Sequence, residues 1–277
     1  MAWNGREKGG CGPAFSYNGE NGAAHDQRED IVSEKVTELD IQNMLSFPFQ
    51  DARWVQKMLL ASLLLVLWFV PVLPWVLFLG YVARIMGGII REGKDPYLPE
   101  WQDLGGMFQE GLKIFGAYLV YSLPVTLLVV IGYLTFVLPM IAIDTAVLPE
   151  GMEIALILGG YLVGFGLIGI GALLGFAFSL FAPLAVCHLV KEDRFGAAFQ
   201  VSRWWQVLKA NWSGFLLAYL ILVGGGMLAY YASQILVFTL ILCCLYPFVL
   251  AGLGAYLGIV GSALFAQAYQ RGSQRMA

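Results

Sequence analysis

The chain has 277 residues, of which 59% are apolar and 13% charged, and its formal net charge is −3. Soluble globular proteins carry about 25% charged residues, so this composition excludes a protein that exposes its whole surface to water. The small negative net charge gives no reason to expect nucleic acid as a partner. Residues 154–190 contain no charged side chain and show no strand-like alternation. The sequence therefore predicts an all-α integral membrane bundle.

The first segment, residues 1–44, is polar and acidic. Residues 1–40 hold eight of the nineteen acidic residues of the chain. This composition predicts a mostly disordered cytoplasmic tail. For residues 31–45 two interpretations stay open, a short amphipathic helix at the membrane surface and a solvated linker. The membrane domain is expected over residues 45–271, followed by a short tail at 272–277.

Five apolar runs follow the tail. They cover residues 58–90, 114–143, 154–190, 212–239 and 240–268. The first run contains Pro71 and Pro74, where we expect a turn between two short spans or a re-entrant hairpin. The third run is too long for a straight span, so we expect it to tilt, to project from the bilayer or to break near Gly175 or Pro183.

Positive charge predicts the topology. Four clusters hold all lysines and arginines after the tail: Arg53 and Lys57; Arg84, Arg91, Lys94 and Lys113; Lys191, Arg194, Arg203 and Lys209; Arg271 and Arg275. Basic residues stay on the cytoplasmic side. Each stretch between clusters must then cross twice, which gives about six spans arranged as three hairpins. We expect a plasma-membrane protein with both termini in the cytoplasm.

A Phe-Gln pattern precedes each expected hairpin, in "FPFQDARWVQK", "GGMFQEGLK" and "GAAFQVSRWWQVLK". We expect each copy to form a cytoplasmic interfacial helix, with cations and rings held at the headgroups. The expected anchors are Arg53, Trp54, Lys57, Arg203, Trp204 and Lys209. Two interpretations stay open, a true internal duplication and the ordinary chemistry of membrane flanks.

Small residues recur at four-residue spacing within the apolar runs. The pairs are Gly160 and Gly164, Gly171 and Gly175, and Gly254 and Gly258. Such pairs let helix backbones approach closely in a membrane. We expect these glycines to pack helices within the chain.

Candidate catalytic groups are missing from the sequence. No metal-ligand spacing, phosphate loop or paired membrane carboxylates appear, and we expect no enzyme, no metal and no cofactor. His188 is a candidate ligand for a haem or pigment, although an interfacial or hydrogen-bonded histidine is the expected role. Ser122, Thr126 and Gln234 could line a solute path or join helices.

Three segments carry a family resemblance. They are "LSFPFQDARW", "GKDPYLPEWQDLGGMFQEGLK" and "FGAAFQVSRWWQVLKANWSGFLLAY". Together they resemble an uncharacterised prokaryotic family of multi-span membrane proteins, domain of unknown function 4013, over residues 45–271. The resemblance implies a prokaryotic membrane protein and supplies no activity or site.

The most specific piece of that resemblance is "LPEWQDL". Pro99 suits the first turn of a helix, and Glu100 and Asp103 suit its positive end. Trp101 is expected to dock at the membrane interface. The segment is expected to join the first two hairpins or to contact a partner.

The sequence favours a non-enzymatic membrane scaffold or accessory subunit that contacts lipids and other membrane subunits. It leaves the oligomeric state open. The first alternative is a transporter or channel for an apolar or zwitterionic solute. The second is a lipid- or pigment-binding membrane protein.

Overall fold

The structure is a computed structural model that describes residues 42–67, 70, 72–145, 149, 151–238 and 243–276. The chain divides into two units, Met1–Asn43 and Met44–Ala277. The tail predicted over residues 1–44 therefore lies almost wholly outside the described residues. Nearly all described residues belong to the second unit.

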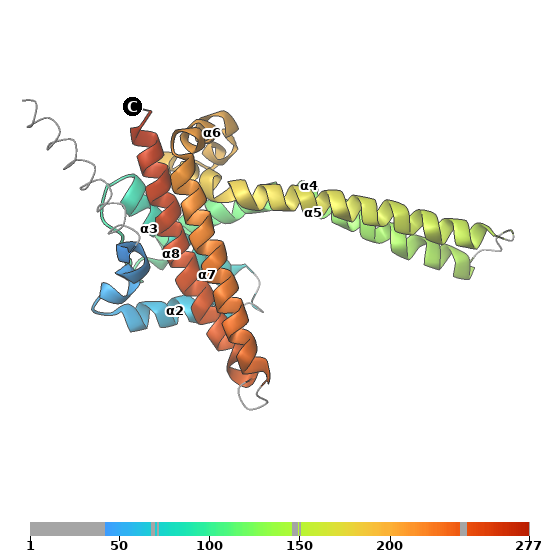
Figure 1. Ribbon diagram of the computed structural model, residues 1–277, viewed down its shortest axis with the longest axis horizontal. Helices are drawn as coiled ribbons and strands as arrows, with labels where there is room; N and C mark the ends of the chain where they lie inside the picture. Colours follow the sequence, from blue (N-terminus) through green and yellow to red (C-terminus); the bar gives the residue numbers. More distant parts are fainter. Residues whose placement is uncertain are drawn as a thin grey trace, which may run out of the picture. The chain divides into compact units, whose positions relative to one another are not determined.

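The described secondary structure of this unit is helical throughout, which confirms the all-α prediction (Figure 1). Residues 42–50 are helical. The later elements are α2 (Trp54–Val66), α3 (Leu73–Ile90), α4 (Leu104–Thr145), α5 (Met152–Glu192), η1 (Phe195–Phe199), α6 (Val201–Ala210), α7 (Trp212–Phe238), η2 (Cys243–Leu245) and α8 (Tyr246–Gln274).

Five helices of the described part are long and apolar enough to cross a membrane, namely α3, α4, α5, α7 and α8. The expected sixth span is the short helix α2. Its 13 residues reach about 20 Å, less than the roughly 30 Å of a hydrocarbon core. The described residues are therefore consistent with a helical membrane bundle, with five helices long and apolar enough to span it and one short apolar helix.

The turn expected at the first pair of prolines lies between α2 and α3. Helix α2 ends at Val66, and α3 begins at Leu73 with Pro74 in its first turn. Proline suits this position because it lacks the N–H that a first helical turn leaves unpaired. Val72, just before the helix, has a φ of 71°.

Helices α4 and α5 run side by side as one long hairpin (Figure 1). They contain 42 and 41 residues, or about 60 Å each, twice the thickness of a hydrocarbon core. Neither Gly175 nor Pro183 ends α5, so a break is excluded among the three alternatives expected for this run. The second Phe-Gln copy forms the first turns of α4 and not a separate interfacial helix.

The core is formed by α3, α8, the first part of α4 and the last part of α5. Tyr81 and Ile85 from α3 are fully buried there, together with Ile114 from α4, Leu184 from α5 and Tyr269 from α8. The outer parts of α4 and α5 expose large apolar side chains. Helix α7 packs along α8, where the rings of Tyr219 and Phe265 lie 4.7 Å apart.

Candidate functional site

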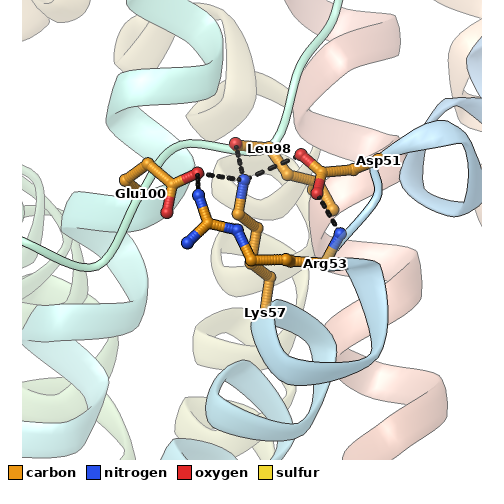
Figure 2. A network of polar contacts seen from close by, with 5 residues as sticks. All are labelled: Asp51, Arg53, Lys57, Leu98 and Glu100. Carbon is orange, nitrogen blue, oxygen red and sulfur yellow. Dashed lines mark hydrogen bonds and ion pairs between the residues drawn. The ribbon is translucent and has the colours of Figure 1, made fainter.

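A buried lysine joins the start of α2 to the loop before α4 (Figure 2). The side chain of Lys57 is 5% exposed. Its Nζ donates to Asp51 Oδ2 at 2.7 Å and to the carbonyl oxygen of Leu98 at 2.8 Å. The same Nζ lies 2.9 Å from Glu100 Oε1. Three acceptors thus surround an ammonium that has three donors.

Asp51 and Glu100 favour the charged form of Lys57, and Arg53 contacts both of these acids. Arg53 Nη2 donates to Glu100 Oε1 at 2.8 Å, and the Arg53 backbone N–H donates to Asp51 Oδ1 at 2.7 Å. The hydrogen bond from Lys57 lowers the pKa of Asp51. Burial alone would lower the pKa of Lys57, but its hydrogen bonds to Asp51 and Glu100 outweigh burial and raise it. Both shifts favour the charged forms of Asp51 and Lys57.

A second charged group surrounds the start of α4. Asp103 caps this helix, because its Oδ1 accepts the Gly106 N–H at 2.9 Å and its Oδ2 pairs with Arg84 Nη2. Arg84 Nε also lies 3.7 Å from Glu110 Oε2. The bond from Gly106 and the pairing with Arg84 lower the pKa of Asp103. A polar cavity of about 390 Å³ opens here, lined by Arg84, Gly87, Gly88, Arg91, Glu92, Tyr97, Asp103 and Glu110.

This geometry corrects part of the prediction for "LPEWQDL". Helix α4 begins at Leu104, so Pro99 lies in the preceding loop and not in a first helical turn. Asp103 stands at the positive helix end as expected. Trp101 stacks on Tyr81 of α3, with ring centroids 4.3 Å apart. The segment is thus packed on the first hairpin.

Residues of three basic clusters bind polar groups that lie beside another cluster in the sequence. Lys113 Nζ pairs with Asp193 Oδ1 at 2.9 Å, which lowers the pKa of Asp193. Lys191 Nζ donates to Ser273 Oγ at 2.6 Å. Arg275 Nη1 donates to the Ala210 carbonyl at 3.1 Å. Residues from the second, third and fourth clusters therefore belong to one connected region.

His188 is buried near the end of α5. Its Nδ1 lies 2.6 Å from the Tyr269 hydroxyl, and its Nε2 lies 3.4 Å from Gln200 Oε1. Both ring nitrogens thus face protein groups. Within the described part of the chain, no three His, Cys, Asp or Glu residues are grouped so that they could hold a metal ion.

The six expected anchors occupy two kinds of position. Arg53, Trp54, Arg203 and Lys209 are exposed. Lys57 is buried in the network described above. Trp204 is also buried, and its Nε1 donates to the Ala198 carbonyl at 3.2 Å.

The expected packing glycines lie against neighbouring helices. Gly160, Gly164, Gly171 and Gly175 face α4, where an added Cβ on Gly171 would lie 3.2 Å from Val129 Cγ2. On α8, Gly258 faces the Phe78 ring and Gly254 faces Leu65.

A closer helix contact escaped the sequence analysis. Gly80 of α3 and Gly111 of α4 lie where an added Cβ would overlap the backbone carbonyls of Met107 and Val76, respectively. Each helix contributes a single glycine here, so the four-residue spacing gives no signal. Only the pairing of the two helices reveals the contact.

Two apolar cavities lie among the helices. One, of about 250 Å³, lies between α3, α5 and α8. The other, of about 460 Å³, is lined by α4, α5 and α6. Ser122, Thr126 and Gln234 line neither of these cavities nor the polar one.

Comparison with known proteins identifies the family. The family described as protein of unknown function (DUF4013) matches residues 63–238. This match covers more than half of the chain, so the protein belongs to that family, as the resemblance predicted. The match includes "LPEWQDL" but not the segment around Asp51. No curated protein matches the chain, and neither does a solved structure.

Proposed function

We propose that this family member is a non-enzymatic scaffold or accessory subunit that packs against other helices in the membrane. The observation that carries the proposal is that some glycines of α5 contact a neighbouring helix and others do not. Gly160, Gly164 and Gly171 are used against α4, whereas Gly166 and Gly169 have open space around them. Exposed small residues on a membrane helix let a second helix approach closely.

The same feature recurs on α7. An added Cβ on Gly224 or Gly226 would meet nothing within 4 Å. Glycine weakens a helix by about 1 kcal/mol relative to alanine. These glycines do not contact the neighbouring helices of the same chain in its described part. Their cost to the helix is offset if a helix of another chain packs closely against them. The occupant can be a different subunit or a second copy of this chain.

The polar groups support a structural role. Lys57 uses its three donors within the protein, and both nitrogens of His188 face protein groups. Ser122 Oγ donates to the Leu119 carbonyl of its own helix at 2.9 Å. Gln234 Nε2 donates to the Tyr246 hydroxyl at 3.4 Å. These placements favour a scaffold over a transporter with a polar path along those residues.

The experiment is purification of the assembly from its native membrane in a gentle detergent. We expect the chain to migrate with stable partner subunits or as an oligomer. The double variant Gly166→Ile/Gly169→Ile should lose them. The control is Ala172→Ile, an exposed residue of the same helix, which should retain them. Helix content measured by circular dichroism must be equal in both variants.

Two results would count against the proposal. The first is a lone monomer from the unaltered chain in several gentle detergents. The second is an equal loss of partners from the glycine variant and the control.

A further inference from the structure

The apolar groove of about 460 Å³ between α4, α5 and α6 has walls made mainly of rings. Its lining residues are Tyr121, Phe178, Phe181, Ala182, Val201, Trp204 and Trp205. The volume falls within the range of about 300–1,000 Å³ that is usual for small-molecule sites. Such a groove suits a long apolar ligand.

The walls of the groove are held in place by hydrogen bonds and by contacts between their rings. The Tyr121 hydroxyl donates to the Ala198 carbonyl at 2.7 Å, and Trp204 Nε1 donates to the same oxygen at 3.2 Å. The Phe181 ring lies 5.9 Å from that of Trp204 and 5.6 Å from that of Trp205. The Tyr121 hydroxyl and the Trp204 indole N–H thus donate to the protein and not to a ligand, so the interior of the groove is apolar.

The rim of the groove is different, because it carries a positive charge and a free donor. Lys209 Nζ lies 5.9 Å from the centroid of the Trp205 ring. Lys209 has no ion pair among the described residues, and the indole N–H of Trp205 has no hydrogen-bond acceptor among them. An ammonium and an N–H at the edge of an apolar groove complement a phosphate attached to a hydrocarbon chain.

The neighbourhood of the groove is also apolar. Leu123 of α4 and Phe176 of α5, just beyond the groove, are 56% and 65% exposed. These surfaces belong to the hairpin of α4 and α5, which we place in lipid because of its length and composition. A ligand that reaches the groove therefore comes most easily from the bilayer.

We propose that this groove binds one acyl chain of an anionic phospholipid, with the phosphate between Lys209 and the indole N–H of Trp205. A cation near the membrane surface attracts anionic lipid by about 1 kcal/mol, or about fivefold in affinity. The site thus selects anionic over zwitterionic lipid.

The test uses the full chain in gentle detergent, stripped of lipid and then mixed with phosphatidylglycerol or phosphatidylcholine of identical chains. Native mass spectrometry measures the bound lipid. We expect one tightly bound lipid, with an about fivefold preference for phosphatidylglycerol. Ala182→Phe should fill the groove and abolish binding, whereas Ala172→Phe on the exposed face of α5 should leave it intact.

The headgroup contact is tested on α6. Lys209→Ala should remove the preference for phosphatidylglycerol and keep the acyl chain bound. Arg203→Ala is the matched control, because Arg203 lies on α6 about half a turn away from the groove-lining residues. If Ala182→Phe does not fold, Val201→Phe fills the groove from its exposed rim.

Equal lipid binding by the groove-filling variant and its control would overturn the proposal. An unchanged lipid preference in Lys209→Ala would do the same. Loss of a co-purifying protein with unchanged lipid would assign the groove to a partner helix. That result also separates this proposal from the scaffold function, which rests on Gly166 and Gly169.

Discussion

Two regions of the second unit have similar apolar composition and opposite surroundings. In α3, most side chains are buried by neighbouring helices, among them Tyr81 and Ile85. In the outer part of the hairpin, Leu162 is 79% exposed and Leu173 is 72% exposed. Hydrophobicity alone thus does not say what covers a helix. Protein covers the inner region, and lipid or a partner must cover the outer one.

The two regions also differ in how they use polar groups. The inner region is connected by ion pairs and capped helix ends, such as those of Lys57 and Asp103. In the outer region, Ser179 Oγ donates to the Phe176 carbonyl of its own helix. The inner region should therefore respond strongly to the loss of one polar partner. The outer region should respond to the gain of a charge.

The largest effect is expected for Lys57→Met. This change leaves Asp51 and Glu100 without the cation between them. Breaking a buried ion pair costs about 3 to 4 kcal/mol. We expect a loss of unfolding free energy of that size, measured by denaturant titration in detergent.

Arg53→Met is the matched control, because Arg53 contacts the same Glu100 from a side chain that is 59% exposed. An exposed pair contributes about 1 kcal/mol or less. If the two variants lose equal stability, burial does not set the strength of this network.

The next effect tests the outer region. Leu162→Arg places a charge about 15 Å from the outer end of α5, close to the centre of a bilayer. We expect membrane insertion to become less favourable by about 3 kcal/mol. The measurement is the inserted fraction in a glycosylation-mapping assay. If the hairpin is exposed to water, the same change should have little effect. That result would show that the hairpin does not lie in the membrane.

Much of the helical arrangement could be predicted from the sequence. The turn between α2 and α3 follows from Pro71 and Pro74, and the separation of α7 from α8 follows from the end of their apolar runs. The number of spanning helices was harder to predict, because composition does not reveal that α2 ends after 13 residues. The helix packs against α3 and α8, two contacts that its composition does not predict.

The charged network could be predicted only in part. The basic clusters are visible in the sequence, but two of their acidic partners are distant from them along the chain. Glu100 lies 47 residues after Arg53, and Asp193 lies 80 residues after Lys113. Spacing on one helix cannot reveal such pairs. Lys57 therefore looked like a headgroup anchor, although the fold buries it.

A smaller effect is expected at the contact between α3 and α4. Gly111→Val would place its side chain against the Val76 carbonyl and push the helices apart. Overpacking of this kind costs about 2 kcal/mol. Gly159→Val is the control, because nothing lies within 4 Å of an added Cβ there. Thermal unfolding followed by circular dichroism should separate the two variants, and equal melting temperatures would contradict the close contact.

The smallest effect concerns acid. The pKa of Asp51 is lowered in the folded state by Lys57, so its carboxylate adds stability that is fully present above the unfolded pKa of about 3.9 and is lost as pH falls through the folded value. Asp51→Asn should cost about 1 kcal/mol at pH 7, because Lys57 keeps Glu100 as an ion-pair partner, and it should cost less at pH 3. Unfolding in detergent from pH 7 to pH 3 measures this difference. Some acid sensitivity should remain in the variant, because the pKa values of Asp103 and Asp193 are also lowered. Asp95→Asn, in the exposed loop before α4 and without an ion pair among the described residues, should lose less stability than Asp51→Asn at pH 7. A constant deficit in Asp51→Asn across the whole range would mean that Asp51 acts through its hydrogen-bond geometry and not through its charge.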